Sequence, residues 1–302
     1  MTPLSEKFSA RRSVAQGADR FLDSSAERSA TIILLAMHRA FEQAISARLR
    51  ERLKTAQRVF VLTGAGVSAE SGVPTFRGGG GAVVWKGMPF SVISSAIMVE
   101  QDLLEVWAWF DYRRAIVEQA QPNPAHLTLA RWQDVFAEFT LATQNVDGLH
   151  ELAGSRDVLE LHGQIWRARC LKCSARRDLR TEDTGERPPK CRACGGEMRP
   201  DVVLFGEFLP TEVFAQAGRA ARQCDVCFVI GTSAIVYPAA MLPEMARDAG
   251  AFLVEINPEE TPLSSICHES LRGRAGDLLP LLDRVVNRPT MRAQGETANK
   301  AK

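Results

Sequence analysis

Four cysteines have the spacing of a metal site. Cys170 and Cys173 form one Cys-x2-Cys pair, Cys191 and Cys194 form a second, and residues 174–190 separate the pairs. Two residues between cysteines let both thiolates reach one tetrahedral ion, and a gap of about 15 to 20 residues lets a hairpin return the second pair to it. We predict a structural zinc site, because a closed shell of four thiolates leaves no position for a substrate. A redox pair or chance clustering is the alternative.

Another Cys-x2-Cys pair, Cys224 and Cys227, could compete for this metal. It lies before and within an apolar run, where a buried strand would use both side chains as small hydrophobic groups, and we favour that interpretation. The chain has 7 cysteines, an odd number, which suits a reducing compartment better than secretion. A cytoplasmic location is therefore expected.

Glycines follow the first apolar run as a phosphate-binding turn requires. The β-branched run 58–66 ends in Gly64, Ala65 and Gly66. Backbone amides in such a turn can approach a pyrophosphate, and the N-terminus of the following helix favours negative charge. Ala69 stands where the dinucleotide fingerprint has its third glycine, which is an allowed variant. A plain tight turn is the alternative.

Polar side chains follow another apolar run. Gln144, Asn145 and Asp147 come after the run 135–142. In an open parallel sheet the carboxyl ends of the strands face the ligand crevice, so these side chains would line it, although an ordinary turn would also explain them. His162 precedes the cysteine array and is a candidate general base, because the pKa of an unperturbed imidazole lies near neutrality. A single histidine can equally be structural.

Alternating strands and helices must position these groups. Apolar runs recur at 226–231 and 251–256 with helical patterns between them, which predicts an α/β fold with a Rossmann-like doubly wound parallel sheet. The polar, proline-containing cysteine segment cannot supply a core strand and is predicted to be a small inserted zinc-ribbon domain. The expected organisation is a disordered extension over 1–25, a catalytic domain over 26–163 and 201–285 that begins with a helix over about 26–56, the zinc module over 164–200, and a disordered tail over 286–302.

Composition argues against several classes of function. The chain has 302 residues, 45% of them hydrophobic, and a net charge of +1, so general attraction to nucleic acid or to an anionic membrane is not expected. The apolar run 31–37 is far shorter than the roughly 20 residues that span a bilayer. We expect a monomer that acts on small or locally docked substrates.

Seven separated motifs, in this order, closely resemble the sirtuin family. They are GAGVSAESGVPTFRG at 64–78, TQNVDGLH at 143–150, LHG at 161–163, the four cysteines, LFGE at 204–207, GTS at 231–233 and INPEETP at 256–262. The resemblance covers about residues 50–285 and is nearest to the bacterial, desuccinylase-like group. It implies an NAD-dependent protein deacylase that acts on acyl-lysine and releases nicotinamide, O-acyl-ADP-ribose and free lysine.

The resemblance also implies roles for individual residues. Phe76 and Arg77 would lie over the nicotinamide end of NAD, and the glycine turn would meet its pyrophosphate. His162 would accept a proton from the ribose hydroxyls after the acyl oxygen attacks C1′, with Asn145 as a second catalytic residue. Val203 and Phe205 would lie in an extended segment that pairs with the substrate backbone. The other expected NAD contacts are Gln144, Asn145, Asp147, Gly231, Thr232, Ser233, Asn257 and Ala275.

Acyl preference is the point where the sequence departs from the desuccinylase-like pattern, Tyr-x-x-Arg, which binds a terminal carboxylate. The best register places Phe110 and Arg113 at these positions, so the guanidinium remains and the phenolic hydroxyl is lost. A shift of two residues would use Tyr112 but leave Ala115 at the arginine position. Losing one neutral hydrogen bond costs only about 0.5 to 1.5 kcal/mol, so activity on both acetyl-lysine and succinyl- or malonyl-lysine is expected.

Three other functions remain open from the sequence. An NAD-dependent protein mono-ADP-ribosyltransferase would use the same C1′ carbon, with a protein side chain attacking it. A dehydrogenase would share the fold and NAD, but the cysteine array has no role in hydride transfer. A nucleic-acid-binding zinc ribbon would need a basic surface, and a net charge of +1 argues against one.

Overall fold

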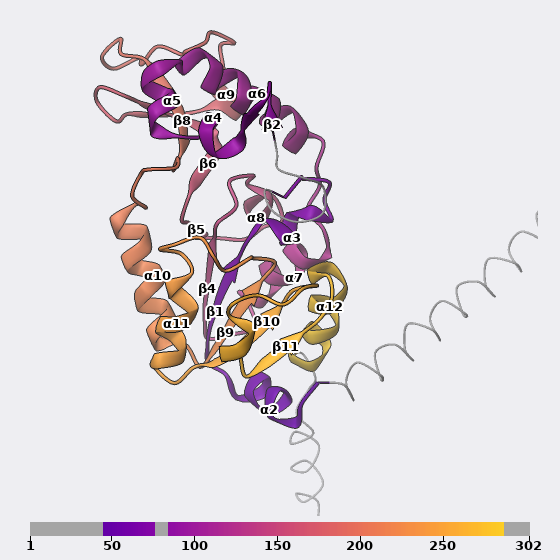
Figure 1. Ribbon diagram of the computed structural model, residues 1–302. Helices are drawn as coiled ribbons and strands as arrows, with labels where there is room; N and C mark the ends of the chain where they lie inside the picture. The colour runs from indigo at the N-terminus through magenta and orange to yellow at the C-terminus, as the bar shows by residue number, and fades with distance from the viewer. Residues whose placement is uncertain (1–44, 76–83, 287–302) are drawn as a thin grey trace, which may run out of the picture. The chain divides into compact units, whose positions relative to one another are not determined.

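The computed structural model describes residues 45–75 and 84–286 (Figure 1). The described residues from Ala47 onward belong to one compact unit. Several predictions fall elsewhere on the chain. The extension 1–25, most of the helix expected over 26–56, Phe76, Arg77 and the tail after Val286 lie outside the described residues.

A six-stranded parallel sheet forms the larger part of this unit. Its strands are β1 (Arg58–Thr63), β4 (Glu138–Thr143), β5 (Leu159–Glu160), β9 (Val226–Ile230), β10 (Phe252–Ile256) and β11 (Glu269–Leu271), in the spatial order β11-β10-β9-β1-β4-β5. Each pair of neighbours is parallel. β9 and β10 are buried along their whole length, which explains their nearly continuous apolar sequences. The predicted Rossmann-like α/β fold is confirmed.

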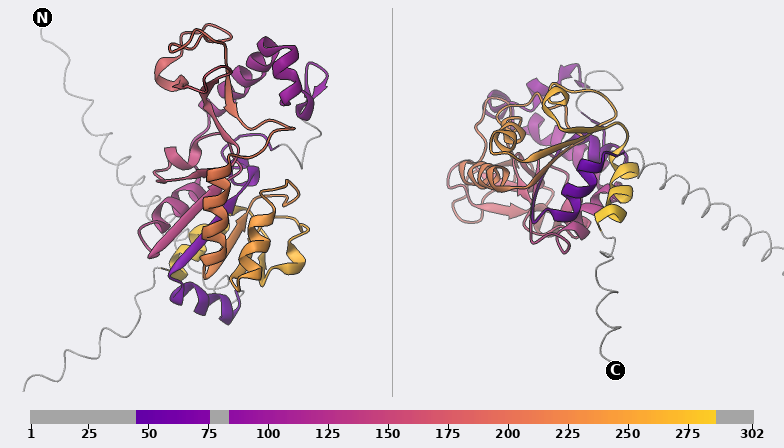
Figure 2. Two further views of the ribbon diagram at one scale, coloured as in Figure 1. Left: turned by 90° about the vertical axis from the view of Figure 1, so that its left-hand side faces the viewer. Right: turned by 90° about the horizontal axis from the view of Figure 1, so that it is seen from below.

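Helices cover both faces of this sheet (Figures 1 and 2). On one face α10 (Thr211–Gln223) packs with α11 (Met241–Asp248), and these helices contact β1, β4, β9 and β10. On the other face α7 (Pro124–Trp132) packs with α12 (Ala275–Val286), which also contacts α2 (Ala47–Thr55) and the short α3 (Ala65–Ala69). No helix within the described ranges is long and apolar enough to cross a membrane.

One predicted strand begins later than expected. The apolar run starts at Val135, but β4 starts at Glu138. The backbone N–H groups of Val135 and Phe136 instead donate to the carbonyl oxygen of Trp132, at 3.1 and 3.2 Å. The Phe136 ring also packs edge-on against the Trp132 ring, with centroids 5.7 Å apart. These apolar residues close the end of α7 and do not extend the strand.

The second Cys-x2-Cys pair belongs to the sheet core. Cys224 and Cys227 are buried in a hydrophobic cluster that also contains Phe60, Leu62 and Leu253 from strands of the sheet. Cys227 lies within β9, and Cys224 immediately follows α10. The buried-strand interpretation of this pair is confirmed.

A smaller lobe lies above the parallel sheet in Figure 1. It contains the antiparallel strands β6 (Gly163–Cys170), β7 (Arg176–Asp178) and β8 (Met198–Val202), in the order β7-β6-β8, with the short helix α9 (Leu179–Glu182). The hairpin β2 (Val84–Trp85) to β3 (Met88–Pro89) and the helices α4 (Phe90–Ile93), α5 (Ala96–Gln101) and α6 (Leu103–Glu118) lie in the same lobe.

Helix α6 packs directly on the cysteine-bearing sheet. The Trp107 ring is fully buried in one cluster with Cys170, Cys191 and Met198, and its Nε1 donates to the Met198 carbonyl oxygen at 2.9 Å. The sequence did not reveal that α6, which precedes β4 in the chain, covers a sheet whose strands β6, β7 and β8 all come after β4. The boundaries given above for the catalytic domain and for the zinc module stay predictions.

Candidate active site

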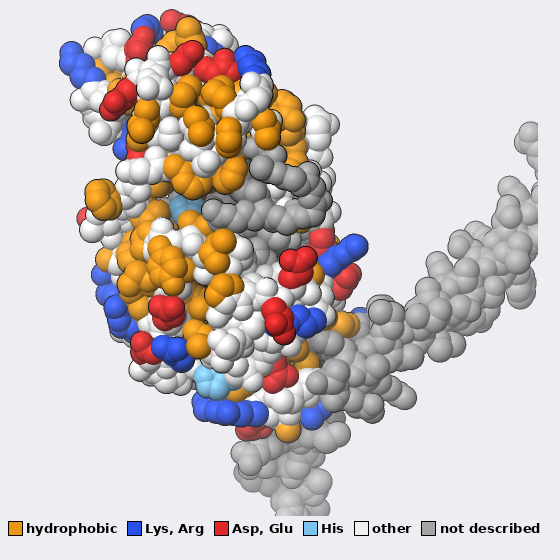
Figure 3. Space-filling view, in the orientation of Figure 1, with side chains coloured by type: hydrophobic (Ala, Val, Ile, Leu, Met, Phe, Trp, Pro, Cys, Tyr) orange, Lys and Arg blue, Asp and Glu red, His pale blue; other side chains and the backbone are white. Residues whose placement is uncertain are grey.

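A cavity of about 720 Å³ lies between the carboxyl ends of the parallel strands and the smaller lobe. Figure 3 shows hydrophobic side chains on both sides of the groove in this region. Asp147 does not line the cavity, and neither does Ala275, which is buried at the start of α12. The predicted site residues that do line it are Gly64, Ala65, Gly66, Phe110, Arg113, Gln144, Asn145, His162, Val203, Phe205, Gly231, Thr232, Ser233 and Asn257.

The glycine turn after β1 packs against the turn after β9. The Gly64 N–H donates to the Ile230 carbonyl oxygen at 3.0 Å, and the Gly66 N–H donates to the Gly231 carbonyl oxygen at 2.8 Å. A Cβ atom at Gly66 would lie 2.8 Å from the Cα of Gly231, and Gly231 itself has a φ of +59°. Both positions therefore require glycine for close approach of the two backbones.

Gly66→Ala is expected to lower the free energy of unfolding by about 1 to 3 kcal/mol, because the added methyl group overlaps backbone atoms that have no room to move. Thermal unfolding measures this loss. Gly218→Ala in α10 is the matched control, since its Cβ would approach only the ends of the Arg222 and Met245 side chains. A Gly66→Ala protein as stable as the wild type would contradict the need for this close approach.

The tautomer of His162 is set by the backbone. Its Nδ1 lies 2.8 Å from the Gln144 carbonyl oxygen, and because a carbonyl oxygen can only accept, Nδ1 carries the proton. Nε2 is then the nitrogen with a free lone pair. Burial lowers the pKa of His162 below its usual value, and the hydrogen bond to Gln144 partly opposes this. The imidazole is therefore neutral at pH 7 and can accept a proton.

The side chain of Asn145 is held in one orientation. Its Nδ2 donates to the Gly64 carbonyl oxygen and to the Ser68 hydroxyl oxygen, each at 3.1 Å. Its backbone N–H donates to Thr143 Oγ1 at 3.1 Å. Because both amide hydrogens are engaged, Oδ1 is the side-chain atom left to bind a ligand, and it can only accept.

A buried histidine, His126, supports Asn145 through Ser68, and a second, His150, packs against His126; the sequence assigned a role to neither. His126 Nδ1 accepts from the Asn123 N–H at 3.3 Å, so its Nε2 carries the proton and lies 3.4 Å from Ser68 Oγ. The His150 ring lies 4.8 Å from the His126 ring. Burial lowers the pKa of His126 to about 4 and that of His150 well below its usual value, so both are neutral at pH 7. The sequence did contain a signal that could have placed His126. Asn123 followed by Pro124 is typical of a helix N-cap, and His126 is the third residue of that helix.

Arg113 is buried at the cavity wall and does not face solvent. Its guanidinium carbon lies 5.7 Å from the centre of the Trp109 ring. Burial lowers the pKa of Arg113, and the charge of Asp147 acts in the opposite direction. Burial raises the pKa of Asp147, while hydrogen bonds from Leu149 and Ser68 and the charge of Arg113 oppose the change. The charge on each of these two groups therefore favours the ionised form of the other.

The two candidate registers for acyl recognition place their side chains differently relative to the cavity. Phe110 and Arg113 both line the cavity. Tyr112 and Ala115 are exposed and do not line it. The Tyr112 ring packs instead on Trp85, with centroids 5.1 Å apart. Only the first register brings both of its side chains to the cavity.

The segment after β8 combines backbone groups that are already paired with two that remain available. The Val203 N–H donates to the His162 carbonyl oxygen at 2.9 Å, and the Phe205 N–H donates to the Ser94 carbonyl oxygen at 2.9 Å. Within the described part of the chain, no hydrogen bond engages the Val203 carbonyl oxygen or the Gly206 N–H. These two groups can accept and donate a hydrogen bond to an extended peptide.

The far end of the cavity is built on the loop after β10. Asn257 Nδ2 donates to the Thr232 carbonyl oxygen at 2.9 Å, and Gln144 Nε2 donates to Thr232 Oγ1 at 3.0 Å. Behind this loop, the buried Glu255 carboxylate pairs with Arg272 at 2.7 Å and accepts further hydrogen bonds from the loop and from the 3-10 helix η1 (Ser264–Ile266). A buried charge with this many partners holds the loop in place.

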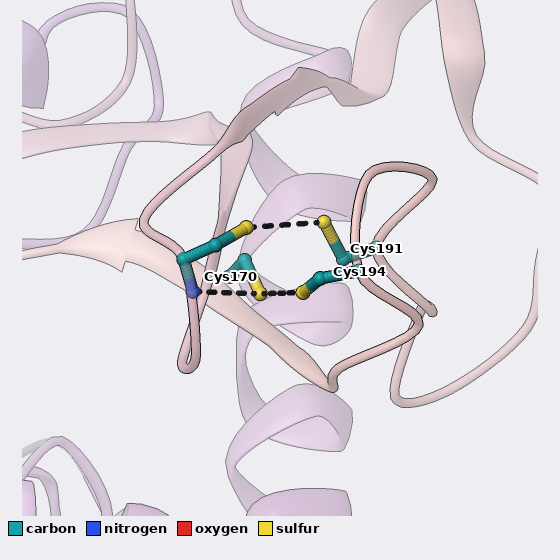
Figure 4. A group of neighbouring side chains, drawn as sticks. Cys170, Cys191 and Cys194 are labelled. Atoms are coloured by element: carbon teal, nitrogen blue, oxygen red, sulfur yellow. Dashed lines mark hydrogen bonds between the residues drawn. The ribbon is translucent and has the colours of Figure 1, made fainter.

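The four predicted zinc ligands converge in the smaller lobe. Figure 4 shows the sulfur atoms of Cys170, Cys191 and Cys194 turned toward one another. The Sγ–Sγ distance is 3.5 Å between Cys170 and Cys194 and 3.6 Å between Cys173 and Cys191, and all four Sγ atoms lie within 4.8 Å of one another. Zn–S bonds of about 2.3 Å in a tetrahedron separate the sulfur atoms by about 3.8 Å. The arrangement therefore fits a four-thiolate zinc site.

The chain is similar in sequence and in structure to proteins of one known family. The sequence model of the Sir2 family matches residues 64–238. NAD-dependent protein deacylase 1 of Caldanaerobacter subterraneus subsp. tengcongensis is 46% identical over 220 residues, which are 73% of this chain and 90% of that protein. A solved Sir2 homologue variant in complex with 2′-O-acetyl-ADP-ribose is 42% identical, with a TM-score of 0.74 over 80% of this chain and 96% of that chain. A Sir2 structure with a p53 peptide and NAD+ is 29% identical, with a TM-score of 0.68 over 78% and 95% of the two chains.

Proposed function

The chain belongs to the Sir2 family, and from that premise we propose that it is an NAD-dependent protein deacylase. It removes acyl groups from lysine in proteins or peptides and releases nicotinamide and O-acyl-ADP-ribose. The observation that carries this function is one cavity lined by both glycine turns, by His162 and by the segment after β8. A nucleotide, a proton acceptor and an extended peptide can meet there.

His162 is the proposed general base. Once the acyl oxygen has bonded to C1′ and nicotinamide has left, its Nε2 would accept a proton from a hydroxyl of the same ribose, which makes that oxygen nucleophilic toward the acyl carbon. Asn145 is the proposed second catalytic residue, and its Oδ1 accepts a hydrogen bond from the same ribose. The hydrogen bond from His162 Nδ1 to the Gln144 carbonyl oxygen and the two bonds from Asn145 Nδ2 support these roles, because they orient both side chains before substrate binds.

NAD supplies the C1′ carbon that takes the acyl oxygen as nicotinamide leaves. In our proposal Gly64, Ala65 and Gly66 hold its pyrophosphate, and Asn257 lies near the adenosine ribose. Gly231, Thr232 and Ser233 contact a phosphate and the adenosine side, and Gln144 helps to form the pocket for the nicotinamide ribose. Roles for Phe76, Arg77, Asp147 and Ala275 stay predictions.

The acyl-lysine substrate is proposed to enter as an extended strand. The Val203 carbonyl oxygen and the Gly206 N–H would pair with its backbone, and backbone pairing of this kind accepts many sequences. The acyl group would then point toward Phe110 and Arg113. A cytoplasmic location and a monomeric state also stay predictions.

Arg113→Met is expected to lower kcat/KM on a succinyl-lysine peptide about 10- to 100-fold, because a hydrogen bond to a charged group contributes about 1.5 to 3 kcal/mol. Acetyl-lysine has no terminal carboxylate and should lose much less. The ratio of the two rates is the informative quantity, since Arg113 also compensates the charge of Asp147. An unchanged ratio would refute the carboxylate role. Tyr112→Phe is the control, and it should leave the ratio unchanged because Tyr112 lies outside the cavity.

Mass spectrometry of acetyl-lysine and succinyl-lysine peptides, incubated with the purified protein with and without NAD, tests the function itself. NAD-dependent loss of the acyl group with an equal amount of nicotinamide supports deacylation. Mono-ADP-ribosyl transfer, the second candidate, would instead leave ADP-ribose from labelled NAD on protein. Nicotinamide release with no loss of either acyl group would favour that candidate.

A further inference from the structure

A phenylalanine beside the peptide segment stands almost fully in solvent. Phe208 is 98% exposed, the largest value among the exposed large hydrophobic side chains of the described residues. An apolar ring stabilises a structure only when it is removed from water, so this ring contributes almost nothing to the stability of the free protein. It retains its whole apolar surface for contact with a bound molecule.

The backbone on both sides of Phe208 is anchored. The Glu207 N–H donates to the Leu204 carbonyl oxygen at 3.0 Å, and the Glu207 carboxylate accepts from the Leu204 N–H at 2.9 Å and pairs with the buried Arg199. On the other side, Leu209 packs against the hydrophobic core of the parallel sheet. The Phe208 ring is thus presented from an ordered backbone, which reduces the entropy lost when a ligand covers it.

Other apolar side chains continue from the cavity toward the surface. Phe205, Ile235 and Tyr237 all line the cavity and are 41%, 49% and 63% exposed. Figure 3 shows hydrophobic side chains gathered along both sides of the groove. The charge nearest to Phe208 in sequence, Glu207, is already paired with Arg199. Phe205, Ile235 and Tyr237 therefore form an apolar part of the rim of the cavity, and the exposed Glu259 and Glu260, which also line it, lie in the loop after β10.

We propose that Phe208 selects protein substrates that carry a large hydrophobic side chain close to the acyl-lysine. This inference rests on the deacylase function proposed above. A peptide that pairs with the Val203–Gly206 segment advances about 3.3 Å per residue, so the residues flanking the acyl-lysine pass within reach of a ring two positions beyond Gly206. Covering the ring with an apolar side chain removes both surfaces from water and favours binding of such substrates.

A panel of acetyl-lysine peptides tests the proposal. Serine occupies every flanking position of the parent peptide, and one leucine is moved through three positions on each side of the acetyl-lysine. We expect kcat/KM of the wild type to rise about threefold to tenfold when leucine stands at one or two positions on the same side, a gain that corresponds to partial burial of one aromatic ring. The gain should appear in KM for the peptide, with KM for NAD unchanged.

Three variants assign the preference to the ring. Phe208→Ala should remove the gain while keeping the activity on the all-serine peptide, and Phe208→Trp should retain it. Leu127→Ala is the matched control, because Leu127 is also exposed, at 44%, but neither of its neighbours in the chain lines the cavity, whereas Glu207 and Leu209 on either side of Phe208 both do. This variant should show the wild-type preference.

Three results would overturn the inference while leaving the deacylase function intact. The first is a wild type that removes acetyl groups from all peptides at equal rates. The second is a leucine preference that survives in Phe208→Ala. The third is arginine outperforming leucine at the preferred position, which would indicate a cation–π contact with the ring. If the wild type has no NAD-dependent activity on any peptide, the proposed function fails first and the inference fails with it.

Discussion

His162→Ala is expected to lower kcat for acyl removal about 10²- to 10⁴-fold, because general-base catalysis by a positioned side chain contributes a factor of that size. Alanine removes the Nε2 lone pair, and no proton acceptor is left at that point of the cavity wall. His162→Tyr should have the same effect, because a phenol with a pKa near 10 is a poor base at pH 7. Nicotinamide release and mass spectrometry of an acetyl-lysine peptide measure the loss.

The wild-type enzyme should lose activity at low pH for the same reason. Burial lowers the pKa of His162 below 6.5, and a base acts only in its unprotonated form. We therefore expect kcat at saturating peptide and NAD to be level near pH 7 and to fall as the pH drops through that lowered pKa. A rate that instead continued to rise well above pH 7 would point to another group as the base.

Loss of activity in His162→Ala identifies the base only if this variant is otherwise intact. His162→Ala should keep its zinc and a thermal unfolding temperature close to that of the wild type. His268→Ala is the matched control, because this histidine does not line the cavity. Turnover by pure His162→Ala close to the wild-type rate would reject His162 as the base.

Cys170→Ser is expected to abolish zinc binding and to unfold the smaller lobe. Apparent binding energies of structural zinc in small domains reach about 10 to 16 kcal/mol, which is comparable to the whole stability of a typical domain. The Trp107 ring is buried in the same cluster as Cys170, so the loss should expose it to solvent. Metal analysis, thermal unfolding and tryptophan fluorescence therefore report on the change without any activity assay.

Acyl removal should fall together with the zinc. β8 belongs to the sheet that carries Cys170, and it leads directly into Val203 and the peptide segment. When the ribbon unfolds, this segment loses the strand that positions it. Cys267→Ser is the matched control, because Cys267 is not part of the four-cysteine cluster and should keep one zinc ion per chain. A Cys170→Ser protein that retained stoichiometric zinc and the wild-type unfolding temperature would contradict a structural site built on these four thiolates.

The sequence alone determined the features that depend on short-range spacing. The distance between Cys170 and Cys173 along the chain decides whether two thiolates can reach one ion, whatever the rest of the fold does. Gly64 and Gly66 directly follow an apolar strand, and a strand of this kind enters a turn at the carboxyl edge of a parallel sheet. His162 and Asn145 could likewise be named from motif order, because the resemblance to sirtuins carries them over residue by residue.

Tertiary structure decided which charges meet and which surfaces stay open. The compensation between Arg113 and Asp147, the support of Asn145 by His126 and the packing of Trp107 on the zinc ribbon all join residues that are far apart in sequence. Apolar content alone also misplaced the start of β4, since Val135 and Phe136 close a helix. Burial and charge compensation arise from contacts between segments that are distant in the sequence. Ligand spacing and turn chemistry depend on a few consecutive residues, so only these two features can be predicted directly from the sequence.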